Sequence, residues 1–412
     1  MSSADEDRHG IRPLMSGALA FTAIVVVSVN LRPGATSVGP ALEEIRHGLG
    51  MSSGVAGVMT AIPGLCFGAI GAVAVRLARR LGLTGGIALG LVAVVVGLAL
   101  RSVIDSVWIF LVLSVVALGG MAVGNVLVPA WIKQHATDGG ERLMTIYSMG
   151  LTLGGAVGSL FAAPLIDHAP GGWRTALGVW ALTAVVAVGP WAVISGRERR
   201  DPADHRMPQV AHVGRLTSSR TAMAMCVYFG VQAMNAYVQF GWLPQIYRDA
   251  GLSAVQAGAL LAMLTGLGIV GGLVMPTLIS RSADVSWVVV LLGLLLVVGY
   301  VGLWLAPATL PWLWSLLLGV SGWTFPGAIF MITARTRDPR ITGQVSGFVQ
   351  PAGYLLAAVG PLVVGLIHQA TGGWAVVLWL LALSGVVMTA AGLMVARRTY
   401  VDDELHTASA GG

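Results

Sequence analysis

The chain has 412 residues, of which 56% are hydrophobic and only 10% are charged, and its formal net charge is +6. This composition is too apolar for a soluble globular protein, so the sequence predicts a polytopic membrane protein. Runs such as LVAVVVGLAL are apolar on every side, which favours membrane helices over the alternating strands of an outer-membrane barrel.

Charge-poor runs of about 20 residues, long enough for a helix to cross the hydrocarbon core, predict an all-α membrane protein with twelve transmembrane helices. The expected spans are 14–40, 52–74, 83–100, 107–131, 143–166, 175–194, 221–245, 254–279, 286–306, 311–333, 342–367 and 374–396. The expected organisation is an N-terminal tail at 1–13, six-helix bundles at 14–194 and 221–396, a linker at 195–220 and a C-terminal tail at 397–412.

Basic residues favour one orientation of this topology. Nineteen Lys and Arg residues, including six arginines between 197 and 220, fall on one side, and the opposite side holds only Arg46, Arg101, Arg174 and Arg248. Basic loops stay in the cytoplasm, so both termini and the linker are expected to be cytoplasmic, in a protein of the inner membrane. The positive charge then reflects topology and contact with anionic lipid, and no nucleic-acid partner is expected.

The two predicted bundles repeat one another. MSSGVAG at 51 returns as LSAVQAG at 252, Gly71 returns as Gly272, and GGW at 171 returns at 372. All three pairs are offset by 201 residues, which contain an even number of spans, so the halves are parallel repeats. This architecture is typical of transporters whose substrate site lies between the halves near the midplane.

Six plus six spans, a basic linker and a short basic turn that begins with Gly71 resemble the major facilitator superfamily. NLRPGATSVGPALEEIRHGLGMSS, followed by AGVMTAIPGLCFGAIGA, is similar to its cyanate and 2-nitroimidazole transporters. The resemblance implies the major facilitator fold, secondary transport, and cyanate-like anions or nitroheterocycles as substrates. It also implies gating or structural roles for Gly71, Arg76, Arg80, Gly272 and Arg281. The turn departs from the superfamily pattern, with Val75 where Asp is common and Ala78 where Gly is common.

Arg32, in the stretch SVNLRPGATSVGP, is the only formal charge expected inside a span. An intramembrane guanidinium is costly and usually faces a water-filled cavity. The alternative is that Arg32 lies near a helix end and snorkels to the headgroups. The repeat places Arg32 opposite Met234, midway between the charges that bound the seventh span, which favours the cavity. Pro33 lacks a backbone donor and is expected to kink the helix there.

Other polar residues within the spans are further candidates for substrate binding. Tyr228, Gln232, Asn235 and Gln239 recur at helical spacing and form a stripe on the seventh span. The remaining candidates are Asn30, Thr36, Asn125, Trp323, Gln350 and Tyr354. Hydrogen bonding between helices is the alternative role for each amide. A cation among amides and phenols, with no carboxylate in the spans, is expected to select a small anion or a small polar molecule.

These patterns predict a secondary active transporter that alternates access between its halves, works as a monomer and uses no cofactor or metal. The alternative within this class is multidrug-type efflux of a hydrophobic compound. A membrane-embedded enzyme is less favoured, because the sequence has no ATP-binding Gly-Lys motif and no nucleophile with a base in a span. A substrate-sensing receptor would normally carry a cytoplasmic signalling domain. The absence of Asp, Glu and deep His residues from the spans leaves uniport, exchange, or symport of a protonatable anion.

Overall fold

The computed structural model describes residues 17–135, 141–198, 216–282, 284–397 and 399–410, and every regular element in these ranges is a helix. The expected N-terminal tail at 1–13 and most of the linker at 195–220 lie outside the described residues. The first half contains α1 (Gly17–Asn30), α2 (Pro33–Thr36), α3 (Leu42–Leu49), α4 (Ser53–Arg101), α5 (Val107–His135), α6 (Glu141–His168) and α7 (Trp173–Glu198).

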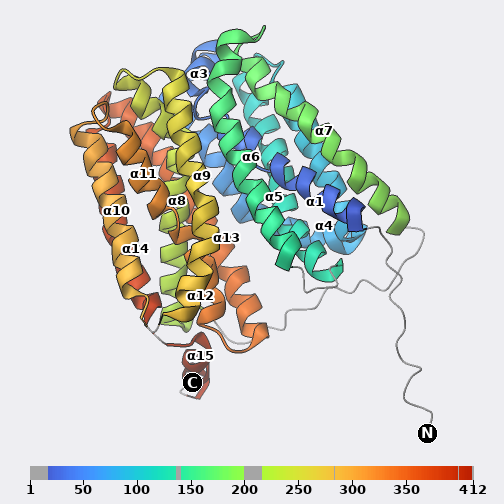
Figure 1. The fold of residues 1–412 in the computed structure, drawn as a ribbon, viewed down its shortest axis with the longest axis vertical. Helices are drawn as coiled ribbons and strands as arrows, with labels where there is room; N and C mark the ends of the chain where they lie inside the picture. Colours follow the sequence, from blue (N-terminus) through green and yellow to red (C-terminus); the bar gives the residue numbers. More distant parts are fainter. Residues whose placement is uncertain (1–16, 136–140, 199–215, 283, 398, 411–412) are drawn as a thin grey trace.

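The second half follows the linker and has the same succession of long helices (Figure 1). Its elements are the 3₁₀ turn η1 (Leu216–Ser218), α8 (Arg220–Asp249), α9 (Ala254–Arg281), α10 (Ser286–Leu305), α11 (Pro311–Ser321), α12 (Thr324–Ala334), α13 (Pro339–Thr371), α14 (Ala375–Ala396) and α15 (Val401–Ala410).

The twelve-span, two-repeat fold expected from the sequence is confirmed. Eleven helical segments of the described chain are long and apolar enough to cross a membrane, and α8 supplies the twelfth span, with polar side chains that lower its hydropathy. The single helix α4 contains two spans, because the chain reverses at Gly82, whose φ of 75° favours glycine. Arg76 and Arg80, expected in a turn, therefore lie on the last helical turns before Gly82.

Hydrogen bonds within the two halves show the repeat. In the first half, Thr183 Oγ1 of α7 donates to Asn30 Oδ1 of α1 over 2.7 Å. In the second, Asn235 Nδ2 of α8 donates to Ser384 Oγ of α14 over 3.0 Å. Thr183 and Ser384 are separated by the repeat offset of 201 residues. Each bundle thus joins its first and last spans by a pair of polar side chains, as membrane helices often do.

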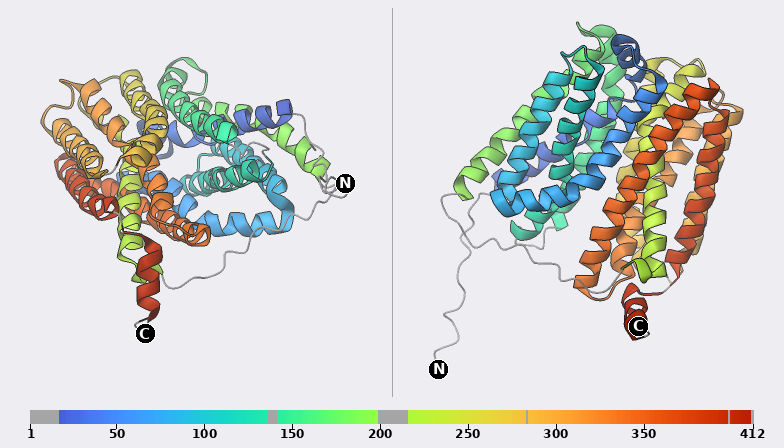
Figure 2. Two further views of the ribbon diagram at one scale, coloured as in Figure 1. Left: turned by 60° about the horizontal axis from the view of Figure 1, so that its bottom comes forward. Right: turned by 180° about the vertical axis from the view of Figure 1, so that it is seen from behind.

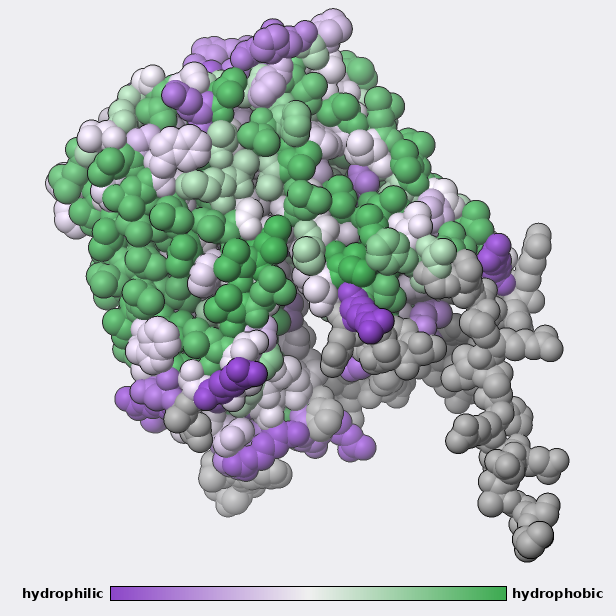
Figure 3. Space-filling view, in the orientation of Figure 1, coloured by the Kyte–Doolittle hydropathy of each residue, from purple (hydrophilic) through white to green (hydrophobic). Residues whose placement is uncertain are grey.

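The two halves meet at the end of the molecule that carries α3 and separate toward the end that carries α15 (Figures 1 and 2). Near α3, a Cβ on Gly365 of α13 would lie 2.6 Å from the carbonyl oxygen of Ser53 in α4, so this close approach of the two helices requires glycine. Toward the α15 end, a Cβ on Gly272, Gly343 or Gly347 would meet nothing within 4 Å. Figure 3 shows the surface hollowed between the halves at that end, below a hydrophobic belt.

The last helix, α15, lies against the second half. Val401 N donates to Arg335 O over 3.1 Å, and the Asp402 carboxylate accepts from the backbone N–H of Arg337 and Asp338. Glu404 accepts from Thr221 N over 3.1 Å and from Thr221 Oγ1 over 2.8 Å, at the first turn of α8. These bonds connect the start of α8 to the segment between α12 and α13.

The contacts of Glu404 predict that the docking of α15 depends on pH. Partial burial raises the pKa of Glu404, but hydrogen bonds from Ser219 and Thr221 and the nearby charge of Arg220 outweigh it, so the pKa is lowered overall. The docked state is therefore favoured at neutral pH and loses this contribution as pH falls from the ordinary glutamate pKa through the lowered one. Glu404→Gln should reduce the hydrogen-exchange protection of α15 at pH 7, whereas Asp403→Asn should change it little, because Asp403 forms an exposed pair with Arg337. Equal protection in wild type and Glu404→Gln would contradict this role.

Candidate substrate cavity

The first span is interrupted at Leu31 and Arg32. α1 ends at Asn30, α2 begins at Pro33, and Arg32 between them has φ −128° and ψ −38°. Proline has no N–H and disfavours the helical conformation of the residue before it, so the kink expected at Pro33 becomes a complete break. Non-helical backbone is tolerated at membrane depth only where protein covers it or where it lines a cavity. The segment after Arg32 is accordingly almost entirely buried.

A small cavity of about 40 Å³ lies beside this break. Its walls come from the first span, both spans of α4, α5 and α8, so residues of both halves enclose it. The polar residues in the walls are Arg32, Thr36, Thr60, Arg101, Ser114 and Tyr237. Among the described residues that line the cavity, two carry a guanidinium and none carries a carboxylate. The cavity is therefore suited to a negatively charged or electronegative guest.

Arg32 is half-buried, and its guanidinium makes no hydrogen bond or ion pair with another described residue. Three phenols lie within its electrostatic reach: Tyr147 of α6, Tyr237 of α8 and Tyr354 of α13. A guanidinium has five N–H donors in a planar fork. Because no described carboxylate pairs with these donors, Arg32 can bind a ligand through two parallel hydrogen bonds.

Aromatic rings from both halves pack together beside the cavity. Phe67 of α4 has its ring centroid 5.4 Å from that of Tyr354 and 6.5 Å from that of Tyr237, and the two tyrosine rings are 6.2 Å apart. The exposed face or edge of such a ring can contact a planar group of a ligand by stacking or by edge contact. This end of the cavity is thus compatible with a flat or rod-like ligand.

Arg101 is a cavity residue that the sequence analysis assigned to an outer loop. The structure corrects that assignment: Arg101 is 1% exposed, and its Nη2 donates to Gly34 O over 2.6 Å. Arg32 is therefore not the only guanidinium that lines the cavity. The partner carbonyl is left free because α2 ends at Thr36 and Val38 N donates to Ala35 O instead, and no sequence pattern revealed that a residue at the end of α4 would reach it.

The polar stripe on α8 does not face the cavity. Asn235 bonds Ser384 of α14, Gln239 Nε2 donates to Tyr300 Oη of α10 over 3.0 Å, and the Tyr228 ring lies against Gly392 of α14. Gln232 is buried, and its Oε1 has no hydrogen-bond partner among the described residues. The α8 residues that line the cavity are Tyr237, Phe240 and Gly241, none of which the sequence analysis selected. Interhelical bonding, the alternative considered above, thus describes Asn235 and Gln239.

The other predicted binding residues divide in the same way. Thr36 lines the cavity while its hydroxyl donates to Gly155 O, and Tyr354 lies beside Phe67 and Tyr237. Asn125 accepts a hydrogen bond from Tyr147 and so contacts a phenol near Arg32. Three residues bond elsewhere: Asn30 to Thr183, Trp323 to Leu267 O, and Gln350 to Ser346.

The residues expected to gate lie toward the α15 end. Arg76, Arg80 and Arg281 are exposed, and none of them has an ion pair within the described part of the chain. Gly71 lies within α4, and Gly272 faces open space. This set therefore makes no closed contact between the halves in the present conformation.

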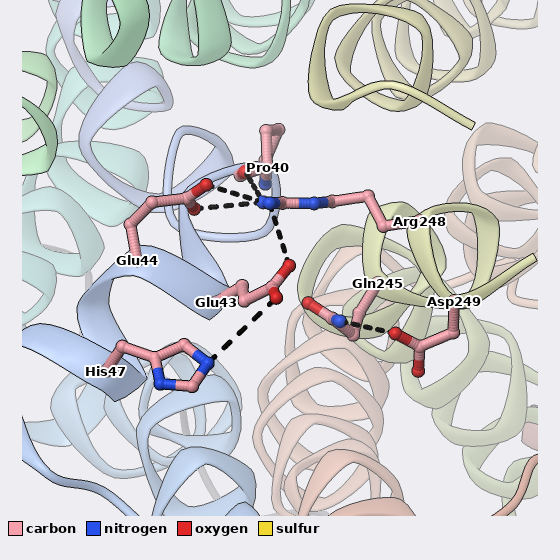
Figure 4. Close-up of polar contacts among 7 residues, drawn as sticks. All are labelled: Pro40, Glu43, Glu44, His47, Gln245, Arg248 and Asp249. Carbon is pink, nitrogen blue, oxygen red and sulfur yellow. Dashed lines mark hydrogen bonds and ion pairs between the residues drawn. The ribbon is translucent and has the colours of Figure 1, made fainter. Parts of the chain in front are cut away.

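A charged cluster joins the halves at the α3 end, as Figure 4 shows. Arg248 of α8 contacts the Glu43 carboxylate of α3 over 2.7 Å and the Glu44 carboxylate over 2.8 Å. The Arg248 side chain is only 18% exposed, so water screens these pairs incompletely. His47 adds an Nε2 atom 4.0 Å from Glu43. We call Arg248, Glu43 and Glu44 the latch; it holds the halves together on the α3 side of the cavity.

The chain matches the family model described as "Major Facilitator Superfamily" over residues 26–361. It belongs to the major facilitator superfamily. The transporter is 31% identical to the 2-nitroimidazole transporter of Escherichia coli (strain K12), over 92% of this chain and 95% of that protein. It is 30% identical to the cyanate transport protein CynX of the same organism, over 85% and 90% of the two chains. It is 31% identical to the uncharacterized transporter YycB of Bacillus subtilis (strain 168), over 92% and 94%.

Solved structures show the same fold. A D-xylose-proton symporter superposes with a TM-score of 0.72 at 12% identity, over 92% of this chain and 97% of that chain. A bacterial homologue of the lysosomal transporter Spinster, in an inward-facing conformation, superposes with a TM-score of 0.69 at 15% identity, over 97% and 98%. The predictions of a major facilitator protein, of secondary transport and of a transporter instead of an enzyme are thereby confirmed.

Loss of the latch should open the transporter on the α3 side. Arg248→Met removes both ion pairs, and partly exposed pairs are each worth about 1 kcal/mol or less, so the open population should rise several-fold. The measurement is a spin-label distance between residues 47 and 250, with Cys66 and Cys226 replaced by serine. Asp105→Asn is the matched control, because it breaks a pair with Arg174 inside one half. An unchanged distance distribution in Arg248→Met would contradict the latch.

The stripe on α8 should contribute to stability and not to affinity. Asn235→Leu removes its hydrogen bond to Ser384, and such bonds between membrane helices are worth about 1 kcal/mol. The melting temperature should fall while anion affinity stays at the wild-type value, and Asn30→Leu in the other repeat should behave alike. If Asn235→Leu lost affinity at an unchanged melting temperature, the stripe would belong to the binding site.

Proposed function

We propose that this transporter moves a small anion, or a small polar molecule with a negative end, by alternating access around Arg32. The observation that carries the proposal is a guanidinium at the break of the first span, facing a cavity and without a carboxylate partner among the described residues. An unpaired charge inside a membrane protein is costly, so it is retained where a ligand supplies the missing charge. We assign Arg32 the role of the binding cation.

The cavity size favours a small ligand in this conformation. A space of about 40 Å³ holds about three water molecules, which matches an anion of a few atoms such as cyanate. A nitroheterocycle would need the halves to move apart, and Phe67, Tyr237 and Tyr354 would then offer it flat faces. The relatives named for cyanate and 2-nitroimidazole transport support these two substrate classes. Two guanidiniums beside the cavity argue against multidrug-type efflux of a neutral hydrophobic compound.

The orientation of the transporter is part of the proposal. If both termini are cytoplasmic, as the basic loops predict, the α15 end faces the cytoplasm and the conformation is inward-facing. The latch then closes the outer side. All described Asp and Glu residues lie at helix ends or beyond them, so the cavity offers no carboxylate to carry a coupling proton. We therefore propose uniport, exchange, or symport of a proton carried by the substrate itself.

Substitution of Arg32 tests the function. Arg32→Gln should reduce the binding of cyanate and thiocyanate by about 100-fold, the value of two hydrogen bonds to a charged ligand, without preventing folding. Arg32→Lys should restore binding only in part, because an ammonium lacks the planar fork. Thermal shift of the purified protein against small anions and nitroheterocycles is the measurement, with exposed Arg76→Gln as the charge-matched control. Wild-type affinity in Arg32→Gln would overturn the assignment.

A further inference from the structure

Arg101 and Ser114 both line the cavity, and each has a buried polar atom without a hydrogen-bond partner among the described residues. Arg101 ends the second span of α4, and Ser114 lies in the first turns of α5. Their side chains are buried, with residue exposures of 1% and 2%. Arg101 Nε and Ser114 Oγ are both buried without a hydrogen-bond partner among the described residues. Buried donors of this kind usually have a partner, so two beside one cavity call for an explanation.

The hydrogen bond to Gly34 accounts for only one of the N–H donors of Arg101 and not for its charge. Its Nη2 donates to the Gly34 carbonyl, which stabilises the broken first span. A backbone carbonyl carries no full charge, however, and no carboxylate of the described residues pairs with the guanidinium. Burying an unpaired cation is costly, and one such hydrogen bond offsets only a small part of that cost. A structural role alone would be served equally by a neutral donor.

The position of Arg101 separates it from Arg32 along the transport direction. Arg32 lies at the break, and the chain then runs through Gly34 toward α3, at the end where the latch joins the halves. Because Arg101 bonds Gly34, it lies on the α3 side of Arg32 within the same cavity. The two like charges repel each other until an anion enters between or beside them.

We propose that Arg101 and Ser114 form a second anion subsite, on the α3 side of Arg32, for a small monovalent anion. Arg101 would supply charge and its Nε donor, and the Ser114 hydroxyl would rotate to donate a second bond. The inference rests on the proposed function for its place in transport, since an anion would pass between the Arg101 and Arg32 subsites as the halves rock. The existence of the subsite does not require that Arg32 bind first.

Ser114→Ala is the cleanest probe, because Ser114 Oγ bonds no described residue and its removal should not harm the fold. Thiocyanate binding to the purified full-length protein is measured by titration calorimetry. We expect Ser114→Ala to weaken binding by about tenfold, the effect of one hydrogen bond to a charged ligand. Ser321→Ala, an equally buried serine in the second half, is the matched control and should bind as wild type does.

The double variant separates this inference from the proposed function. In Arg32→Gln, weak thiocyanate binding should persist, and adding Ser114→Ala should reduce it by a further tenfold or so. If Arg32→Gln alone bound like wild type, the proposed function would fail while a weaker Ser114→Ala would still support the subsite. If Ser114→Ala bound within twofold of its parent in both backgrounds, the subsite would be overturned. Arg101→Lys is a second test, because lysine keeps the positive charge but lacks the Nε donor. Thiocyanate affinity should fall in this variant.

Discussion

The break in the first membrane span at Leu31 and Arg32 determines most of what surrounds the cavity. Once Pro33 prevents the helix from continuing, backbone groups in the middle of the membrane need new partners. The short helix α2 that follows the break ends at Thr36, so Gly34 O accepts from the Arg101 guanidinium and Thr36 O accepts from the Ser159 hydroxyl, while the Thr36 side chain donates to Gly155 O of α6. The same break turns Arg32 out of the helical path and toward a space that both halves enclose. The break in the backbone thus shapes the cavity and places the Arg32 guanidinium beside it.

The two ends of the molecule differ in how the halves meet, and this difference places the cavity in a transport cycle. Toward α3, glycines of α4 allow backbone-distance contact with α13, and the latch adds charge on top of that packing. Toward α15, a Cβ on Gly272, Gly343 or Gly347 would meet no atom within 4 Å, so the halves are not in contact there. Two halves that meet on one side of the cavity and separate on the other (Figure 2) have the geometry that alternating access requires. The latch is charged and partly accessible, so it can exchange protein contacts for water when the α3 side opens.

The sequence predicted the fold more fully than the site, and the residues show why. Membrane spans follow from composition and length, and the repeat follows from an offset that can be counted, so neither depends on detailed packing. Arg32 was found because a charge in an apolar run is conspicuous. The face toward which a polar side chain turns is a tertiary property: Asn235 and Gln239 form a regular stripe, yet they bond Ser384 and Tyr300 inside their own half.

Arg101 and Tyr237 were missed for the complementary reason. Arg101 looked like an ordinary loop charge, because the Gly34 carbonyl that it bonds is free only where the four-residue helix α2 ends. Tyr237 lies off the polar stripe of α8, among apolar neighbours, and its relation to Arg32 depends on how the two halves dock. Contacts between halves carry no periodicity that one sequence can display.

The most direct measurement of the central claim is the position of a bound anion. Selenocyanate, a heavier analogue of cyanate, can be located by its selenium signal in crystals of the wild-type transporter. The account predicts a selenium peak in the cavity beside the break, with the anion within hydrogen-bond distance of the Arg32 guanidinium. A peak along the stripe of α8, or none in the cavity at a concentration that stabilises the protein, would contradict it.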